Sequence, residues 1–224
     1  MNKTIAIICA ALAFPTLASA DDVKLNVQHF WQDDACWCGV AAAEILEQYV
    51  KGDDWVYRDD RQSKLAELSG KVGTYQGAGT DPICGPLGGM DHNDMQDQLT
   101  RRLGSGYSYR SNSTVNGMSA NLHGEFLRMI DSVNQPIIVN GHTRYADGTK
   151  ALNQHWYVVI GYRDADNNPN TLDADKDGYF VHDPAYNSPA AGRLKTLTKG
   201  KFVSHRNFVT LLTGSDNRVH WFKR

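Results

Sequence analysis

Residues 32–46 read QDDACWCGVAAAEIL, and the interpretation of the whole chain starts from this stretch. From Cys38 onward the residues are rich in alanine, and apolar side chains recur at helical spacing up to Tyr49, which predicts an α-helix over 38–49. Cys38 therefore stands at the start of a helix, where unpaired backbone N–H groups and the helix dipole favour a thiolate. Gly39 beside it would let a substrate approach the backbone. Cys38 is thus a candidate nucleophile on its position alone.

The first twenty residues have the pattern of a secretory signal peptide. A short basic head precedes an apolar run at 4–17, and residues 18–20 read Ala-Ser-Ala, a small-residue cleavage site. We expect residues 1–20 to be removed and the mature chain to be exported, either to the periplasm or out of the cell. The run is short for a membrane span, and no later stretch is apolar enough to insert. A lipoprotein anchored through Cys9 is disfavoured, because Cys9 lies inside the apolar run.

Composition and cysteine count narrow the class of protein. About 200 mature residues can bury one good core or a core split into two lobes, and a formal net charge of −2 without a basic patch argues against a nucleic-acid partner. Cys36, Cys38 and Cys84 remain after the leader, which is an odd number for an exported protein. One disulfide and one free thiol is the simplest account.

The pattern of apolar residues changes halfway along the chain. Helices are expected in the first half and strands in the second, which predicts an α+β fold in one domain over 21–224. The helical lobe would span about 30–133 and the β lobe about 134–224, with a cleft between them. The expected helices are 38–49, 59–69, 93–102 and 119–133, with a glycine-rich loop at 71–92. The expected strands are 135–142, 155–163 and 177–184, with further segments near 193–197, 207–213 and 218–222.

Two of these strands carry residues that suit a cysteine nucleophile. His155 opens the strand HWYVVIGYR, and Asp183 ends the next strand, in FVHDP. If the two strands are neighbours, His155 Nδ1 could donate to Asp183, which would orient the imidazole. Gln32 carries an amide that could donate to an oxyanion. Each residue also has an ordinary interpretation: a structural histidine, a turn-forming Asp-Pro, an inert glutamine, or a Cys38 that is only a disulfide partner. Their joint occurrence favours catalysis.

At this point the sequence resembles a known group. The segments QDDACWCGVAAAEIL, QPIIV, HWYVVIGY and FVHDP are similar to the papain-like cysteine peptidases, and most similar to the bacterial branch related to bacteriocin-processing peptidases. CGVAAAEIL and QHWYVVIGYRDADNN are also similar to secreted streptococcal immunoglobulin-G-degrading cysteine proteases. The resemblance covers roughly residues 30–50, 83–90 and 135–185. It implies a papain-like fold, with a catalytic helix in the helical lobe packed against an antiparallel sheet or barrel, and hydrolysis of protein or peptide substrates without a cofactor.

The resemblance assigns a role to each residue of the site. Cys38 becomes the nucleophile, His155 the base and Asp183 the residue that orients it. Gln32 becomes an oxyanion-hole donor together with the backbone N–H of Cys38. Because papain has an asparagine as its third member, Asn187 is the alternative to Asp183.

The resemblance also implies a disulfide and part of a substrate site. It pairs Cys36 with Cys84, which lies in a glycine-rich loop, and it places Gly88 and Gly89 at the border of the substrate. One departure is that papain has a tryptophan directly after the nucleophile, whereas Trp37 here precedes Cys38.

Other functions and sites remain as alternatives. An amidase, deamidase, transglutaminase or acyltransferase acting on protein side chains or cell-wall peptides would share the triad, and a disulfide-stabilised binding domain would need none of it. An inhibitor or accessory protein could restrain the activity, and a role in virulence would follow only from the likeness to immunoglobulin-degrading enzymes. Residues 172–183 begin like a calcium loop, but Pro184 stands where the loop needs a glutamate, so a hairpin turn is preferred. The histidines, His123 among them, show no metal-ligand spacing, and we expect no metal.

Overall fold

The protein is described here from a computed structural model of its 224 residues. The described residues are 21–33, 37–52, 62, 90–113, 120–145, 150–168, 170–188, 194–212 and 218–224. Within these ranges the helices are α1 (Cys38–Lys51), α3 (His92–Leu103), α4 (Ala120–Asp131) and α5 (His205–Leu212). In the same ranges, no helix combines the length and apolar character needed to cross a membrane.

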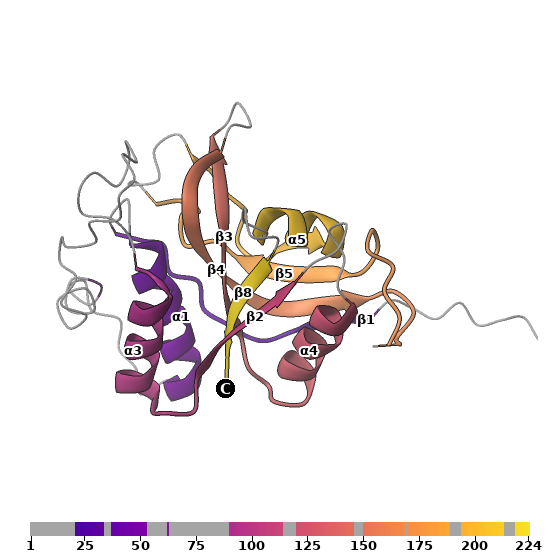
Figure 1. Cartoon of the computed structure of the whole chain (residues 1–224), viewed down its shortest axis with the longest axis horizontal. Helices are drawn as coiled ribbons and strands as arrows, with labels where there is room; N and C mark the ends of the chain where they lie inside the picture. Colours follow the sequence, from indigo (N-terminus) through magenta and orange to yellow (C-terminus); the bar gives the residue numbers. More distant parts are fainter. Residues whose placement is uncertain are drawn as a thin grey trace, which may run out of the picture.

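In the described part of the chain, eight strands of different lengths form one antiparallel sheet (Figure 1). Its main path runs β2-β8-β3-β4-β5-β7, while β1 pairs with β4 and β6 pairs with β3. The strands are β1 (Asp21–Lys24), β2 (Ser108–Ser113), β3 (Ile137–Tyr145), β4 (Lys150–Asp164), β5 (Gly178–His182), β6 (Leu194–Lys195), β7 (Lys201–Ser204) and β8 (Arg218–Lys223).

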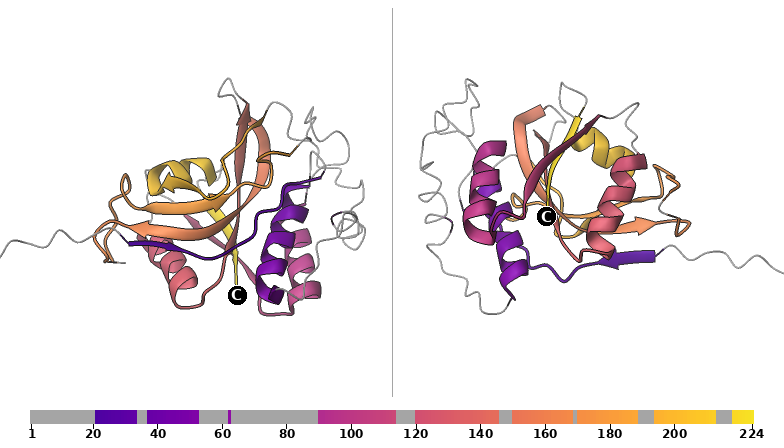
Figure 2. Two further views of the ribbon diagram at one scale, coloured as in Figure 1. Left: turned by 180° about the vertical axis from the view of Figure 1, so that it is seen from behind. Right: turned by 60° about the horizontal axis from the view of Figure 1, so that its bottom comes forward.

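Helices cover the sheet from two sides, as the two views in Figure 2 show. Because side chains alternate along a strand, β4 supplies both cores: Trp156 and Val158 belong to the cluster that contains α1 and α3 residues, whereas Tyr157 and Val159 belong to the cluster of α4 and α5. The α+β fold predicted from the sequence is thereby confirmed, with helix α1 packed against the sheet.

The helical side is fixed by caps and by a buried ion pair. Asp91 caps α3 and forms a reciprocal capping box with Asp94. Glu47 on α1 is only 2% exposed and pairs with Arg102 of α3 at 2.7 Å and with Lys51 at 2.5 Å. These contacts hold α1 and α3 side by side (Figure 1).

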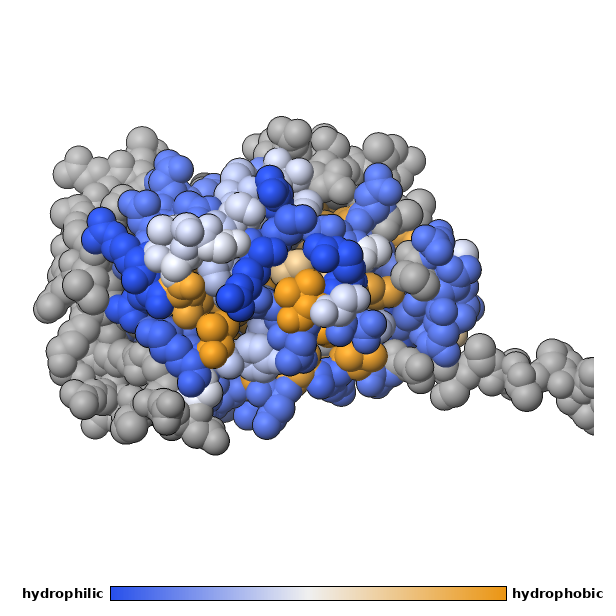
Figure 3. All heavy atoms as spheres, turned by 90° about the horizontal axis from the view of Figure 1, so that it is seen from below, coloured by the Kyte–Doolittle hydropathy of each residue, from blue (hydrophilic) through white to orange (hydrophobic). Residues whose placement is uncertain are grey.

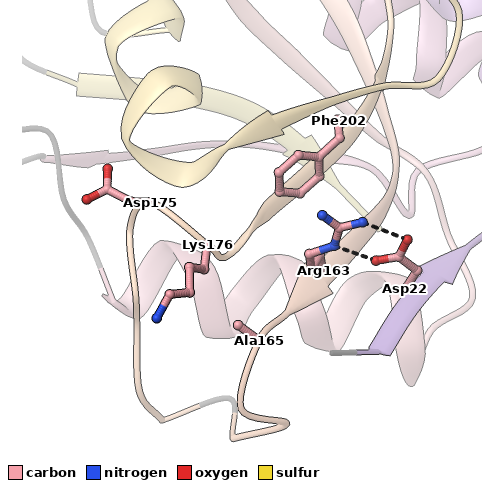
Figure 4. Close-up of a pocket in the computed structure, with 6 residues that line it drawn as sticks. All are labelled: Asp22, Arg163, Ala165, Asp175, Lys176 and Phe202. Carbon is pink, nitrogen blue, oxygen red and sulfur yellow. Dashed lines mark hydrogen bonds and ion pairs between the residues drawn. The ribbon is translucent and has the colours of Figure 1, made fainter. Parts of the chain in front are cut away.

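Strand β1 pairs antiparallel with the end of β4, in the register Asp21 to Asp164 and Lys24 to Gly161. A Cβ atom at Gly161 would overlap the carbonyl oxygen of Val23 and would lie 2.9 Å from Lys24 Cα, so this close pairing requires glycine. Figure 4 shows the side chains that close the same corner: Asp22 accepts two hydrogen bonds from the Arg163 guanidinium, at 2.7 and 3.0 Å, beside Phe202.

Two expectations need correction. The segment 207–213 is not a strand but helix α5, because Phe208, Val209 and Leu212 recur at helical spacing and are buried on the sheet. Strand β2 lies inside the segment 30–133 that was expected to be helical, so the helical lobe is interrupted in sequence. The expected helix 59–69 and most of the loop 71–92 lie outside the described residues.

The surface seen from below in Figure 3 is mainly hydrophilic. Its apolar side chains form small patches that hydrophilic residues separate. Over the part of the chain that the structure describes, the large hydrophobic side chains that are exposed are Trp31, Val50 and Tyr109. Of these, Trp31 is immediately beside a predicted site residue, Gln32.

Candidate active site

Cys38 is the first residue of α1 and is a free cysteine with 5% of its surface exposed. Trp37 occupies the N-cap position without a side-chain cap, so the first-turn N–H groups at Cys38 receive no capping side chain from it. Gly39 is needed for packing: a Cβ there would lie 2.8 Å from Met90 Cβ and 2.9 Å from Trp156 Cδ1. The glycine therefore lets helix α1 pack closely on β4.

His155 and Asp183 form a buried pair. The two residues are each 1% exposed, and His155 Nε2 lies 2.7 Å from Asp183 Oδ1. Antiparallel pairing of β4 with β5, in the register Val158 to His182, brings them together, as the sequence predicted. The expected ring nitrogen is wrong, since Nε2 and not Nδ1 contacts the carboxylate. Nδ1 is thereby left available to Cys38.

Asp183 is held from several directions. Its Oδ1 also accepts a hydrogen bond from Ala185 N at 2.9 Å, and its Oδ2 accepts one from Leu197 N at 2.8 Å. Its main-chain carbonyl oxygen contacts His29 Nε2 at 2.8 Å. The position of the Asp183 carboxylate is therefore fixed independently of its contact with the imidazole. Sequence reasoning missed Leu197 and His29, because neither is near Asp183 in sequence.

The charges around His155 favour its protonated form. Burial alone would lower the pKa of the imidazole, but the negative charges of Asp183 and Cys38 and the hydrogen bond to Asp183 raise it to about 10. An imidazolium therefore persists at neutral pH beside the thiol. This is the electrostatic state that an ion pair between a thiolate and a histidine requires.

Tyr157 is a neighbour that the sequence did not single out. Its ring meets His155 edge-on, with 4.5 Å between centroids, and its hydroxyl donates to the carbonyl oxygen of His142 at 2.9 Å. Burial first, and then the charges of Asp183 and Cys38, raise the pKa of Tyr157 well above its usual value. The hydroxyl therefore stays neutral. Its position two residues after His155 on the same strand face is the pattern that could have identified it.

Gln32 is fully buried and its backbone is tied to the loop that follows Asp183. Its N–H donates to Pro184 O at 2.8 Å, and its carbonyl oxygen accepts from Ser188 Oγ at 2.6 Å. A pocket of about 250 Å³ lies directly before it and is lined by Gln28, His29, Phe30 and Trp31. The segment that bears Gln32 thus lies against the Asp183 loop and beside a hollow.

The remaining predicted residues divide into two groups. Asn187 is exposed and lies in the left-handed region with φ 61°, while Asp183 is the residue at the imidazole. The other group, Cys36, Cys84, Gly88 and Gly89, lies outside the described residues, so the disulfide and the glycine border of the substrate stay predictions.

Comparisons with known proteins agree with this architecture. A solved structure described as the crystal structure of UfSP from C. elegans superposes with a TM-score of 0.54 at 9% sequence identity, covering 92% of this chain. The chain spans only 34% of that structure's length, so the likeness concerns the fold. A search of curated proteins gave no significant match. The profile of the Peptidase_C39 like family matches residues 21–208, and the chain therefore belongs to the Peptidase_C39 like family.

Proposed function

We propose that the protein is a cysteine peptidase in which Cys38 is the nucleophile, His155 the acid and base, and Asp183 the orienting residue. The observation that carries this proposal is the buried contact of His155 with Asp183 beside the Cys38 thiol at a helix start. Family membership supports the class of reaction.

The reaction would proceed through two acyl transfers. The Cys38 thiolate attacks the substrate carbonyl carbon and forms a C–S bond, and the electron pair of the C=O bond moves to the oxygen. When the oxyanion collapses, the C–N bond breaks and the His155 imidazolium gives its proton to the leaving amine. Neutral His155 then takes a proton from water, the water oxygen attacks the acyl-enzyme, and the C–S bond breaks to release the acid and Cys38.

Two parts of the structure suit the remaining needs of this reaction. The backbone N–H of Cys38 in the uncapped first turn, with the Gln32 side-chain amide, would bind the oxyanion. The pocket that contains Phe30 and the exposed Trp31 would bind an apolar side chain of a protein or peptide substrate. We assign the enzyme to the bacteriocin-processing-like branch of papain-like peptidases, on the motifs at 32–46 and 155–162.

We further propose that the enzyme is exported, either to the periplasm or out of the cell. The family match begins at residue 21, directly after the expected Ala-Ser-Ala cleavage site. A Cys36–Cys84 disulfide would be consistent with an oxidising compartment.

The nucleophile is tested by thiol labelling. Iodoacetamide should modify Cys38 at neutral pH faster than an ordinary thiol, and His155→Ala should lose most of this rate. Asn187→Gly is the matched control, because glycine suits the left-handed backbone there and the Asn187 side chain is exposed. Labelling at the same slow rate in all three proteins would refute the triad.

Proteome-wide profiling of new N-termini, comparing wild type with Cys38→Ala, tests the reaction class. New peptide ends that depend on Cys38 support peptidase activity. Mass changes on side chains without new ends would instead support the amidase, deamidase, transglutaminase or acyltransferase alternative, which shares the thiol but uses another acceptor.

A further inference from the structure

A second cluster of polar side chains lies at the other end of the hairpin that carries His155 and Asp183. One ring nitrogen of His123 and one carboxylate oxygen each from Asp164 and Asp177 lie within 4.8 Å of one another. The three side chains are buried, at 0%, 3% and 1% exposure. They come from α4, from the last residue of β4 and from the residue before β5.

His123 has a ring nitrogen with no protein partner. Its Nδ1 contacts the Tyr179 hydroxyl at 3.2 Å, and the same hydroxyl contacts His205 Nδ1 at 2.8 Å. Among the described residues, the buried Nε2 of His123 has no hydrogen-bond partner. If the single hydroxyl proton goes to His205, His123 Nδ1 must donate to the oxygen. Nε2 then carries a lone pair that accepts no hydrogen bond from the described residues.

Among the described residues, the two carboxylates form no ion pair. Asp177 accepts hydrogen bonds from Ala165 N at 2.8 Å and Asp173 N at 2.6 Å, so it also shapes the loop. Yet in the described parts of the chain no lysine or arginine pairs with Asp164 or Asp177.

The nearby cations serve exposed carboxylates instead: Lys176 pairs with Asp173, and Arg206 pairs with Asp175. Figure 4 shows Asp175 and Lys176 on this loop. Buried carboxylates ordinarily need a paired charge or a metal, and hydrogen bonds from main-chain N–H groups supply neither.

The His123 imidazole does not pair with the Asp164 and Asp177 carboxylates. No hydrogen bond or ion pair in the described part of the chain joins His123 to Asp164 or Asp177, although the three donor atoms converge within 4.8 Å. The gap between the donors suits an ion at roughly 2.0–2.2 Å from each after small side-chain movements.

We propose that His123 Nε2, Asp164 and Asp177 form a binding site for one divalent transition-metal ion, with Zn²⁺ as the best match. One imidazole and two carboxylates are a nitrogen and oxygen donor set that suits Zn²⁺, whereas Ca²⁺ takes oxygen ligands alone. The Tyr179 contact at Nδ1 has the form of the outer hydrogen bond that fixes the tautomer of a metal-binding histidine. The ion would link α4 to both strands of the β4–β5 hairpin and so stabilise the hairpin that carries His155 and Asp183.

Zn²⁺ titration of the full-length mature chain carrying Cys38→Ala tests the site. This background removes the reactive thiol as a competing zinc ligand, and it makes the result independent of any peptidase activity. After treatment with a chelator, calorimetry should find one Zn²⁺ per chain. At a hundredfold excess over Kd the melting temperature should rise by roughly 5–10 °C.

Matched variants locate the ligands. Asp164→Asn and Asp177→Asn keep an oxygen acceptor for the loop, and with His123→Gln they should each weaken Zn²⁺ binding by at least about 100-fold, more than the loss of a residue that only orients a ligand. Asp175→Asn, an exposed change on the same loop, should leave the affinity unchanged. If a ligand variant fails to fold, Co²⁺ added to the Cys38→Ala protein should still give the visible absorption bands of a nitrogen and oxygen site.

Three outcomes would overturn the proposal. They are the absence of stoichiometric Zn²⁺ or Co²⁺ binding, Zn²⁺ binding that all three ligand variants retain, and binding of Ca²⁺ that persists in His123→Gln while Zn²⁺ does not bind. The last result would mean an oxygen-only site in which the imidazole has no part.

Discussion

The two ring nitrogens of His155 have different surroundings, and this determines which nitrogen would transfer the proton in the proposed reaction. Nε2 contacts Asp183, so the proton that reaches the leaving amine must come from Nδ1, on the side of Cys38. Chain order and strand register could predict that His155 and Asp183 meet. They could not predict which nitrogen does so, because that depends on the rotation of the ring against Tyr157 and on the anchoring of Asp183 by Leu197 and His29.

Substitutions at Asp183 should separate orientation from charge. In Asp183→Asn the side-chain oxygen can still accept from His155 Nε2, so we expect a loss in kcat/KM of about tenfold, against roughly 100- to 1,000-fold in Asp183→Ala. The amide cannot accept from both His155 and Leu197 N–H, which should cost about 1–3 kcal/mol of stability. Steady-state kinetics and urea denaturation measure the two effects. Equal kinetic losses in both variants would argue against an orienting role.

The decline of activity at high pH should reflect the deprotonation of His155. Because the imidazolium is needed as the acid, kcat/KM should hold through pH 8 and fall as the pH passes the His155 pKa of about 10. Removing the charge of Asp183 in Asp183→Asn should move this limb to lower pH. The profile is measured with a peptide substrate identified by N-terminal profiling, and an unshifted limb in the variant would contradict the assignment.

At the scale of elements, the β4–β5 hairpin organises the molecule. His155 and Asp183 lie at one end, and Asp164 and Asp177 lie at the other. The long apolar runs in β4 and β5 made these strands predictable from sequence. Strands β2 and β7 were missed, because SYRSNS is polar and KFVS is short, and their pairing depends on distant partners. Helix α5 was mistaken for a strand because its β-branched residues match both patterns until the face it buries is known.

Substitution of Gly161 should loosen β1 from the hairpin. Gly161→Ala places a methyl group against Val23 O and Lys24 Cα, so β1 must shift, and we expect a loss of about 1–3 kcal/mol. Gly106→Ala is the control, since its Cβ would meet Arg224 Cγ at 3.5 Å, an ordinary contact. Denaturation curves and hydrogen exchange at Val23 and Lys24 give the measurement. Unchanged exchange in Gly161→Ala would contradict the close pairing of β1 with β4 at this glycine.

For the whole molecule, buried histidines set the response to acid. His182 accepts a hydrogen bond from Gly200 N and contacts Val27 O, and burial is the main reason that its pKa falls to about 4. Burial likewise lowers the pKa of His205 to about 4, with His123 adding to the effect. Both side chains are therefore neutral in the folded protein at pH values where the unfolded chain binds protons.

Stability should consequently fall as the pH decreases from about 6.5 to 4. In this window the unfolded state binds more protons at His182 and His205, so each residue contributes up to about 1.4 kcal/mol of destabilisation per pH unit. Urea denaturation between pH 4.5 and 7 measures the slope. His182→Gln should be less stable at pH 7 but should show a shallower decline, and an unchanged slope would exclude His182 as a contributor.

The position of β8 has a consequence for the timing of folding. This strand is the last element of the described chain, yet it lies between β2 and β3 in the interior of the sheet. Tyr109 on β2 and His220 on β8 are in contact and are 111 positions apart in the sequence. Asp22 on β1 and Arg163 on β4 are paired and are 141 positions apart. Such distant pairings close slowly, and the sheet lacks an interior strand until the ribosome has synthesised residues 218–223. A nascent chain would therefore remain open at least until these residues are made, which is the condition in which a polypeptide can still be threaded through a narrow channel.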